Sequence, residues 1–117
     1  MTNITRIEAG PRMSEAVIHG DKIYTCGIVA DKAVGKSVYE QTKEVLEQID
    51  ALLGQAGSDK TRILKANIWL TNMATFAEMN KAWDAWVVPN QTPARATVES
   101  KLAAPGYDVE IMIEAAR

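Results

Sequence analysis

The sequence contains one cysteine, Cys26, and one histidine, His19, among 117 residues. Cys26 has no second cysteine with which to form a disulfide inside the chain, which is typical of proteins in a reducing compartment. One Cys and one His cannot build a zinc site, and no cluster of Asp, Glu and His has the spacing of metal ligands. A thiol nucleophile at Cys26 would need an activating base, and His19 falls in a predicted hairpin turn. We therefore interpret Cys26 as a small apolar strand residue and His19 as a surface residue, and we expect no metal.

Other features that identify common classes of protein are also missing. No apolar run approaches the roughly 18 residues of a membrane span, so we expect no membrane association. The net charge of −2 argues against attraction of nucleic acid or anionic lipid by the whole surface. There is no phosphate-binding Gly-rich loop, dinucleotide fingerprint or Gly-x-Ser-x-Gly elbow. No apolar signal-peptide segment is visible, which predicts a cytoplasmic location. Any chemistry must then use Arg, Glu, hydroxyl and backbone groups, without a cofactor.

The length predicts a single domain over residues 1–117, and the composition, 47% hydrophobic and 24% charged, is that of a globular protein. A capping box at Ser37–Glu40 precedes an apolar stripe with helical spacing over residues 38–53. A second capping box, at Thr75–Glu78, is expected to open another helix, which Pro89 ends.

Short alternating runs between these helices predict strands. They lie at residues 4–9, 16–18, 22–26, 62–70, 93–99 and 107–114. A Gly at position 27 suggests a bulge or a close backbone approach. The order β-β-β-α-β-α-β-β indicates an α+β fold, with one mixed, mostly antiparallel six-stranded sheet and both helices on one face. The other face of such a sheet would be bare, which predicts self-association.

Arg95 stands alone in the small and apolar run 93–99. Alternation places Arg95, Thr97 and Glu99 on one face of that strand, and Glu110 follows in the alternating run 109–114. If neighbouring strands carry Arg95 and Glu110 toward one cleft, they supply an anion clamp and a general base. The same pattern fits an exposed strand face with an ordinary Arg–Glu pair, worth under about 1 kcal/mol. The residue types alone leave both interpretations open.

Several motifs together resemble the RidA/YjgF family of imine deaminases. They are Pro93-Ala94-Arg95-Ala96-Thr97-Val98-Glu99, then Pro105 and Val109-Glu110-Ile111, preceded by Gly20-x-x-Ile23-x-Thr25-x-Gly27 and Phe76-x-x-Met79-Asn80-x-x-Trp83. The resemblance covers nearly the whole chain. It implies a chorismate-mutase-like α+β subunit and a homotrimer, in which three sheets form a central barrel and three clefts lie between neighbouring subunits.

The resemblance also implies an activity. RidA-type members hydrolyse reactive 2-imino acids, the tautomers of 2-aminoacrylate-type enamines, to 2-keto acids and ammonia without cofactor or metal. By this resemblance, Arg95 holds the substrate carboxylate. Glu110 orients or deprotonates the attacking water and helps protonate the leaving ammonia. The backbone of Cys26 and Gly27 lines the cleft, and the carbonyl of Thr97 helps place the water.

The chain departs from the family pattern at several positions. The aromatic cleft residue near the N-terminus falls at Met13. Cys26 stands where RidA itself has serine, and Ile28 where it has glutamine. A two-residue gap in the turn at 103–106 would place Met112, instead of Glu110, at the acid position. These differences indicate a RidA-related subgroup.

Three functions follow as alternatives. The first is the deaminase, and the second is a protein of the same fold that binds a small carboxylate or keto acid without turnover. The third is RNA cleavage, attributed to some relatives. It is disfavoured by the negative net charge, the absence of a Lys/Arg stripe and the lack of a His pair for acid–base work. We expect a small-molecule partner and no nucleic acid.

Overall fold

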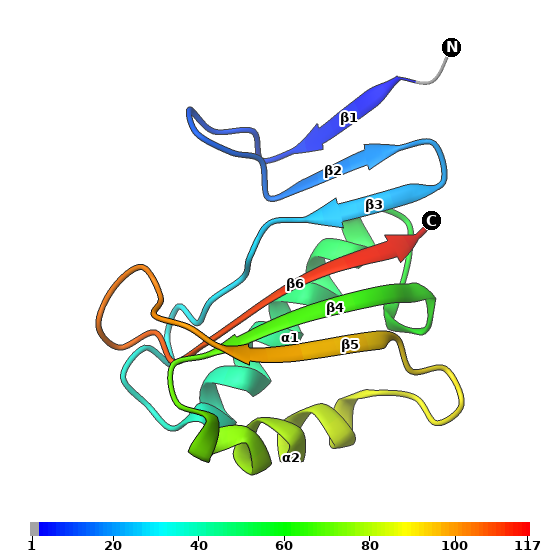
Figure 1. Ribbon diagram of the computed structural model, residues 1–117. Coiled ribbons are helices and arrows are strands. Elements are labelled where there is room, and N and C mark those ends of the chain that lie inside the picture. The colour runs from blue at the N-terminus through cyan, green and yellow to red at the C-terminus, as the bar shows by residue number, and fades with distance from the viewer. Residues whose placement is uncertain (1–2) are drawn as a thin grey trace.

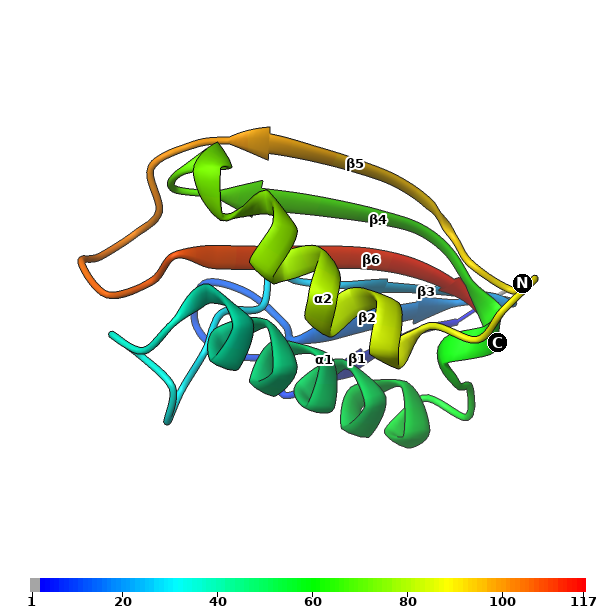
Figure 2. The same ribbon diagram turned by 90° about the horizontal axis from the view of Figure 1, so that it is seen from below.

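The protein, in a computed structural model that describes residues 3–117, is a six-stranded sheet with two helices on one face (Figure 1 and Figure 2). The strands are β1 (Ile4–Ile7), β2 (Ala16–His19), β3 (Lys22–Thr25), β4 (Ile63–Leu70), β5 (Ala94–Glu99) and β6 (Val109–Ala116). The helices are α1 (Val38–Gln55) and α2 (Phe76–Trp86), preceded by short 3-10 turns at Lys60–Arg62, before β4, and Met73–Thr75, before α2. The predicted α+β class and element order are confirmed.

The strands lie in the order β1-β2-β3-β6-β4-β5. All neighbouring pairs are antiparallel except β4 and β5, which are parallel. A parallel pair needs a crossover connection, and α2 supplies it. As a consequence β5 takes the edge of the sheet, while the C-terminal strand β6 is inserted between β3 and β4.

Helix α1 begins as its sequence predicts. The Ser37 hydroxyl accepts a hydrogen bond from the backbone N–H of Glu40 at 3.1 Å. The apolar stripe from Val38 to Leu53 is buried against the sheet. Gly57, with φ of +79°, follows the helix and allows the N–H of Ser58 to return to the Leu53 carbonyl at 2.9 Å. The sequence therefore fixes both ends of this helix locally.

The capping box expected at Thr75–Glu78 is wrong. Thr75 makes no side-chain cap, because it closes a 3-10 turn with φ −93° and ψ 8° and its hydroxyl donates back to the Asn72 carbonyl. Asn72 caps that turn by accepting from the N–H of Ala74 at 2.9 Å. Glu78 instead accepts from the N–H of Tyr39 at 3.4 Å, which links α2 to the start of α1.

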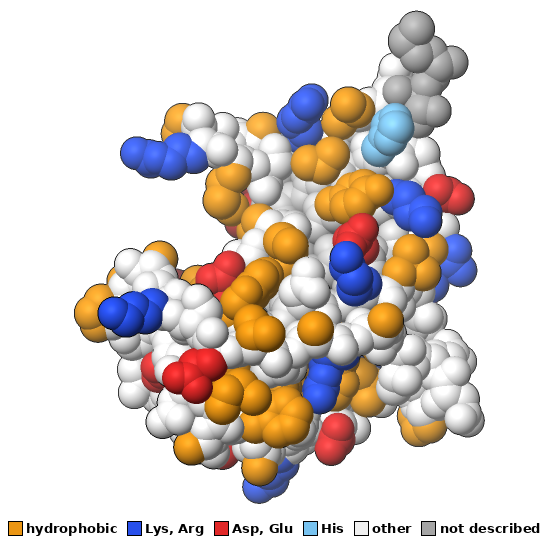
Figure 3. Space-filling model, viewed as in Figure 1, with side chains coloured by type: hydrophobic (Ala, Val, Ile, Leu, Met, Phe, Trp, Pro, Cys, Tyr) orange, Lys and Arg blue, Asp and Glu red, His pale blue; other side chains and the backbone are white. Residues whose placement is uncertain are grey.

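The two faces of the sheet differ, as expected. On the helix-covered face, alternate residues of β4 and β6, such as Ile68 and Ile111, are fully buried. The opposite face is covered by nothing else in residues 3–117 and carries Val98 at 51% exposure and Tyr24 at 43%. Figure 2 shows both helices on one side, and Figure 3 shows hydrophobic side chains dispersed among charged ones on the other. Self-association through this uncovered face stays a prediction.

Within residues 3–117, neither helix combines the length and apolar character needed to cross a membrane. The expectation about an N-terminal targeting segment begins at Met1 and Thr2, which lie outside the described residues.

Candidate functional site

The pairing of β3 with β6 shifts by one residue immediately after β3. Tyr24 pairs with Glu114, but the next bridge joins Ile28 to Ile111. Positions 25–27 therefore face positions 112–113, three residues against two. This is a β-bulge, a feature that is over-represented beside active sites because it redirects side chains and frees backbone groups. The bulge that Gly27 suggested in the sequence is confirmed.

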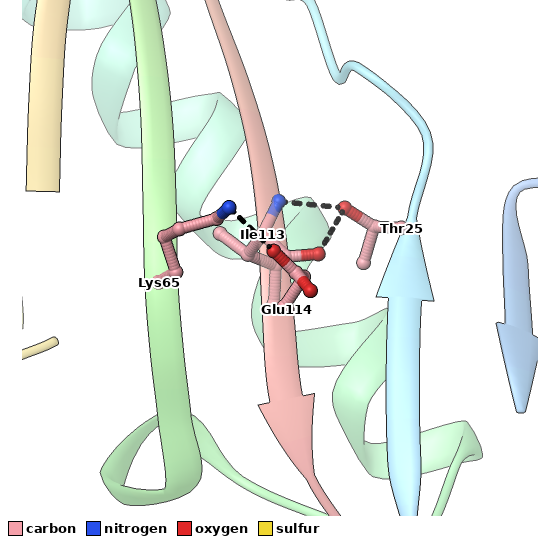
Figure 4. Close-up of polar contacts among 4 residues, drawn as sticks. All are labelled: Thr25, Lys65, Ile113 and Glu114. Atoms are coloured by element: carbon pink, nitrogen blue, oxygen red, sulfur yellow. Dashed lines mark hydrogen bonds and ion pairs between the residues drawn. The ribbon is translucent and has the colours of Figure 1, made fainter. Parts of the chain in front are cut away.

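Thr25 connects the two strands at the bulge (Figure 4). Its buried hydroxyl accepts a hydrogen bond from the N–H of Ile113 at 3.0 Å. The same hydroxyl lies 2.9 Å from the carbonyl oxygen of Cys26, to which it donates, and 3.5 Å from that of Ile113. A side chain thus replaces a backbone hydrogen bond. Figure 4 also shows the neighbouring cross-strand ion pair of Lys65 and Glu114, 2.9 Å apart on the uncovered face.

The bulge brings Gly27 and Glu110 into contact. A Cβ atom at position 27 would lie 1.9 Å from Oε2 of Glu110, so any larger residue would displace that carboxylate. The N–H groups on either side of Gly27 are bonded, Cys26 to the Glu15 carbonyl and Ile28 to the Ile111 carbonyl, each at 2.8 Å. The N–H of Gly27 itself has no hydrogen-bond partner within residues 3–117. A free donor therefore lies beside a carboxylate, an arrangement suited to a polar ligand.

A cavity of about 410 Å³ adjoins this point and is lined by Met13, Glu15, Cys26, Gly27 and the side of α1 that includes Gln48. Figure 3 shows the molecule hollowed below the loop that joins β1 to β2. Three predicted binding residues, Met13, Cys26 and Gly27, are therefore brought together. The thiol of Cys26 is kept protonated, because burial and then the Glu15 carboxylate raise its pKa. A backbone hydrogen bond opposes this rise, and the Glu110 carboxylate adds a smaller increase. A neutral thiol is a poor nucleophile, in agreement with the sequence interpretation.

Arg95 lies under α2, on the helix-covered side of the edge strand β5. Its Nη1 donates to Oδ1 of Asn80 at 2.8 Å. Its guanidinium carbon lies 5.2 Å from the ring centre of Trp83 and 5.7 Å from that of Phe76. The spacing of Phe76, Asn80 and Trp83 places them on one side of α2. The cation is thus held by a neutral amide and two rings. The one ion pair within residues 3–117 joins Lys65 to Glu114, so the charge of Arg95 is uncompensated there.

Thr97 lies two residues further along the same face. Its Oγ1 is buried and has no hydrogen-bond partner within residues 3–117. Buried polar groups are nearly always bonded, so an orphaned hydroxyl on the same strand face as the uncompensated charge of Arg95 points to a bound ligand or water. The sequence reasoning assigned a role to the Thr97 carbonyl and missed both this hydroxyl and Asn80. The helical spacing of Asn80 with Phe76 and Trp83 is a signal that could have identified the amide.

The expectation that neighbouring strands carry Arg95 and Glu110 to one cleft is wrong within a single chain. Strand β4 separates β5 from β6. Ala66 of β4 pairs with Arg95 on one side and with Ile113 on the other, so these three side chains share the helix-covered face. Glu110 is three positions from Ile113 and points to the uncovered face. The alternative of an ordinary Arg–Glu cross-strand pair fails for the same reason.

The predicted site residues therefore fall into two separate groups, which we call half-sites. One has the cation Arg95 with the Thr97 hydroxyl, and the other has Glu110, Gly27 and the cavity. Met112, the alternative at the acid position, pairs with Asn67 on the same face as Glu110. Its thioether cannot accept a proton as a carboxylate does. Among residues 3–117 no group of three or more His, Cys, Asp or Glu side chains is placed to hold a metal ion.

Known proteins share both the sequence and the fold of this chain. The family model described as Endoribonuclease L-PSP matches residues 3–117. A RutC family protein of Haemophilus ducreyi is 47% identical over 113 residues, which cover 97% of this chain and 96% of the relative. The RutC family protein YoaB of Escherichia coli is also 47% identical over 113 residues, with 97% of each chain covered. The crystal structure of a YjgF family protein from Neisseria meningitidis matches with a TM-score of 0.95 and 45% identity, covering 98% of this chain and 95% of the other.

Proposed function

The chain belongs to the endoribonuclease L-PSP family, which agrees with its resemblance to YjgF proteins, and we propose that it hydrolyses 2-imino acids to 2-keto acids and ammonia. The observation that carries the proposal is the state of Arg95. A half-buried guanidinium held by an amide and two rings, without a carboxylate, is ready to bind a carboxylate ligand through two parallel hydrogen bonds.

The complete site forms between two copies of the chain. Arg95 and Thr97 of one copy would bind the carboxylate end of the substrate. Glu110 and the Gly27 N–H of the next copy would face the imine carbon, and the cavity beside them would receive the substrate side chain. The bare sheet face and the edge position of β5 support an assembly that brings these half-sites together. A homotrimer with sites at its subunit interfaces is the arrangement we propose.

The reaction requires only that the substrate and a water molecule be held in position and that protons be transferred. The carboxylate of Glu110 takes a proton from water as the water oxygen bonds to C2 of the iminium, and the C=N π electrons move to nitrogen. Glu110 then returns that proton to the amino group, and the C–N bond breaks to release ammonia while the hydroxyl passes its proton to the Glu110 carboxylate and becomes the keto group. Release of that proton to ammonia or solvent restores the carboxylate. An iminium is already electrophilic, so orientation and one acid–base residue can supply the catalysis. No cofactor takes part in these steps.

A carboxylate-binding protein without turnover is the second candidate. The Arg95 half-site is complete whatever Glu110 does, and Met13, 55% exposed, replaces the aromatic residue expected at the cleft. The endoribonuclease named in the family description is less favoured. His19, the single histidine, lies at the β2–β3 hairpin, at the opposite end of β3 from the bulge.

The test is hydrolysis of imines generated in situ by an amino-acid oxidase, with semicarbazide trapping the free imine. Arg95→Ala and Glu110→Gln should each lower the rate by about 100-fold, the effect expected for losing an electrostatic contact or a general base. Arg62→Ala and Glu114→Gln are the matched controls, because these side chains bind the Arg117 carbonyl and Lys65 instead.

If the wild type gives no acceleration, the deaminase is ruled out, and saturable keto-acid binding lost in Arg95→Ala would establish the binding protein. If only Arg95→Ala lowers the rate, Glu110 is not the acid–base residue. The alignment that places Met112 at the family's acid position would then be favoured, and another group would have to transfer the proton.

A further inference from the structure

Within residues 3–117, the hydroxyl of Thr25 is the one side-chain group that replaces a strand-to-strand hydrogen bond at the bulge (Figure 4). We propose that Thr25 is a positioning residue of the imine-hydrolysing site: its hydroxyl selects the bulged register in which Gly27 lies against Glu110. This inference rests on the proposed function for its catalytic consequence, but not for its structural one.

A side-chain hydroxyl is needed at the bulge because the two strands contribute unequal numbers of residues there. With three positions of one strand facing two of the other, the backbone cannot pair every group between Tyr24–Glu114 and Ile28–Ile111. The N–H of Ile113 lies in this interval, on a residue that is 1% exposed and cannot reach water. The Thr25 hydroxyl accepts a hydrogen bond from this N–H at 3.0 Å and donates its own to the Cys26 carbonyl at 2.9 Å. Without the hydroxyl, a buried donor would be orphaned.

A competing register would satisfy the same donor. If the ladder continued unbulged from Tyr24–Glu114, Gly27 would pair with Ile111, and Ile28 with Glu110. A slip of one residue sends each side chain to the other face of the sheet. Ile28, now buried at 7% exposure, would leave the core, and Gly27 would no longer lie against the carboxylate. The hydroxyl of Thr25 therefore favours the one register that builds the half-site.

Loss of the Thr25 hydroxyl should affect the chemical step and not the binding of the substrate carboxylate. Arg95, on β5, does not contact the bulge, so carboxylate binding should survive the loss of the hydroxyl. Glu110 and the Gly27 N–H, which would face the imine carbon and the water, should be displaced. The effect should therefore fall on kcat and leave KM nearly unchanged.

Three variants test this. Thr25→Val keeps the shape of the side chain and removes the hydroxyl, whereas Thr25→Ser keeps the hydroxyl. Thr42→Val is the matched control, because Thr42 is also buried but its hydroxyl donates to the Val38 carbonyl within α1, at 2.7 Å. We expect Thr25→Val to lower kcat by roughly 10- to 100-fold, as a displacement near 1 Å can do. Thr25→Ser should retain most of kcat, and Thr42→Val should retain all of it.

A second readout is independent of activity. In amide NMR spectra, Thr25→Val should shift the Gly27 and Ile113 resonances and speed hydrogen exchange at Ile113, and Thr25→Ser should restore both. If Thr25→Val fails to fold, Thr25→Ala, which removes the hydroxyl without adding bulk, replaces it. Unchanged resonances, or a lower melting temperature with kcat intact, would overturn the proposal. If the wild type hydrolyses no imine, the proposed function fails, and these resonances alone decide whether Thr25 sets the register.

Discussion

Arg95 and Glu110 lie on opposite faces of one sheet, with β4 between the strands that carry them. One chain therefore presents its cation and its carboxylate in opposite directions. A substrate held by both would have to bind between two copies, with the guanidinium from one and the carboxylate from the other. The proposed site therefore requires an oligomer in which Arg95 of one copy lies near Glu110 of the next.

The first prediction is complementation between inactive variants. Arg95→Ala and Glu110→Gln should each be inactive, yet oligomers refolded from a mixture should recover activity. With random mixing, roughly a quarter of the sites in a cyclic assembly combine an intact Arg95 with an intact Glu110. The measurement is the imine assay on mixed and separately refolded samples. A mixture no more active than its components would mean that the two residues do not act in a shared site.

The second prediction concerns the uncovered sheet face. Val98→Glu should dissociate the oligomer, because Val98 is exposed on this face in the single chain and a carboxylate buried there would cost several kcal/mol. Sedimentation should give three times 12.8 kDa for the wild type and a lower mass for the variant. Val34→Glu is the control, since Val34 is an exposed apolar residue in the loop before α1. A wild type that sediments as a monomer would contradict the prediction.

The third prediction tests why Arg95 is held by an amide. Asn80→Asp would place a carboxylate at the atom that Arg95 Nη1 now contacts at 2.8 Å, and this carboxylate would compete with that of the substrate. We expect KM to rise by about tenfold, equivalent to about 1.4 kcal/mol. Asn90→Asp makes the same chemical change in the loop before β5 and should have no effect. A KM unchanged by Asn80→Asp would show that Arg95 does not bind the substrate.

The fourth prediction concerns the thiol in the cavity. Burial and then the Glu15 carboxylate raise the pKa of Cys26, so alkylation by iodoacetamide should be slow at neutral pH and accelerate only in alkaline solution. Glu15→Gln should move that acceleration to lower pH, and Glu47→Gln on α1 should not. Because the folded-state pKa is raised, the protonated thiol stabilises the fold below its ordinary pKa. This stabilisation is lost as the pH rises through the folded-state value. An alkylation profile unaffected by Glu15→Gln would contradict the assigned cause.

Much of the fold could be read from local patterns. The Ser37 cap, the apolar stripe of α1 and the alternation of Arg95 and Thr97 depend on neighbours within a few residues, and the structure confirms them. The Thr75 cap was wrong because a preceding 3-10 turn, capped by Asn72, set the backbone of Thr75. Local signals predict well where no adjacent element competes for the same residues.

The sequence by itself determined the elements, the one-sided sheet and the residues of the family motif, because hydrophobic periodicity and capping act over a few residues. The tertiary structure alone decided where those residues point. The insertion of β6 between β3 and β4 and the parallel crossover to β5 send Arg95 and Glu110 to opposite faces. The one-residue bulge at Cys26–Gly27 depends on the register of strands about 85 positions apart in the chain, which no local pattern encodes. Pairing between distant strands is settled by the packing of the whole sheet, and so is the separation of the predicted site residues into two groups on opposite faces.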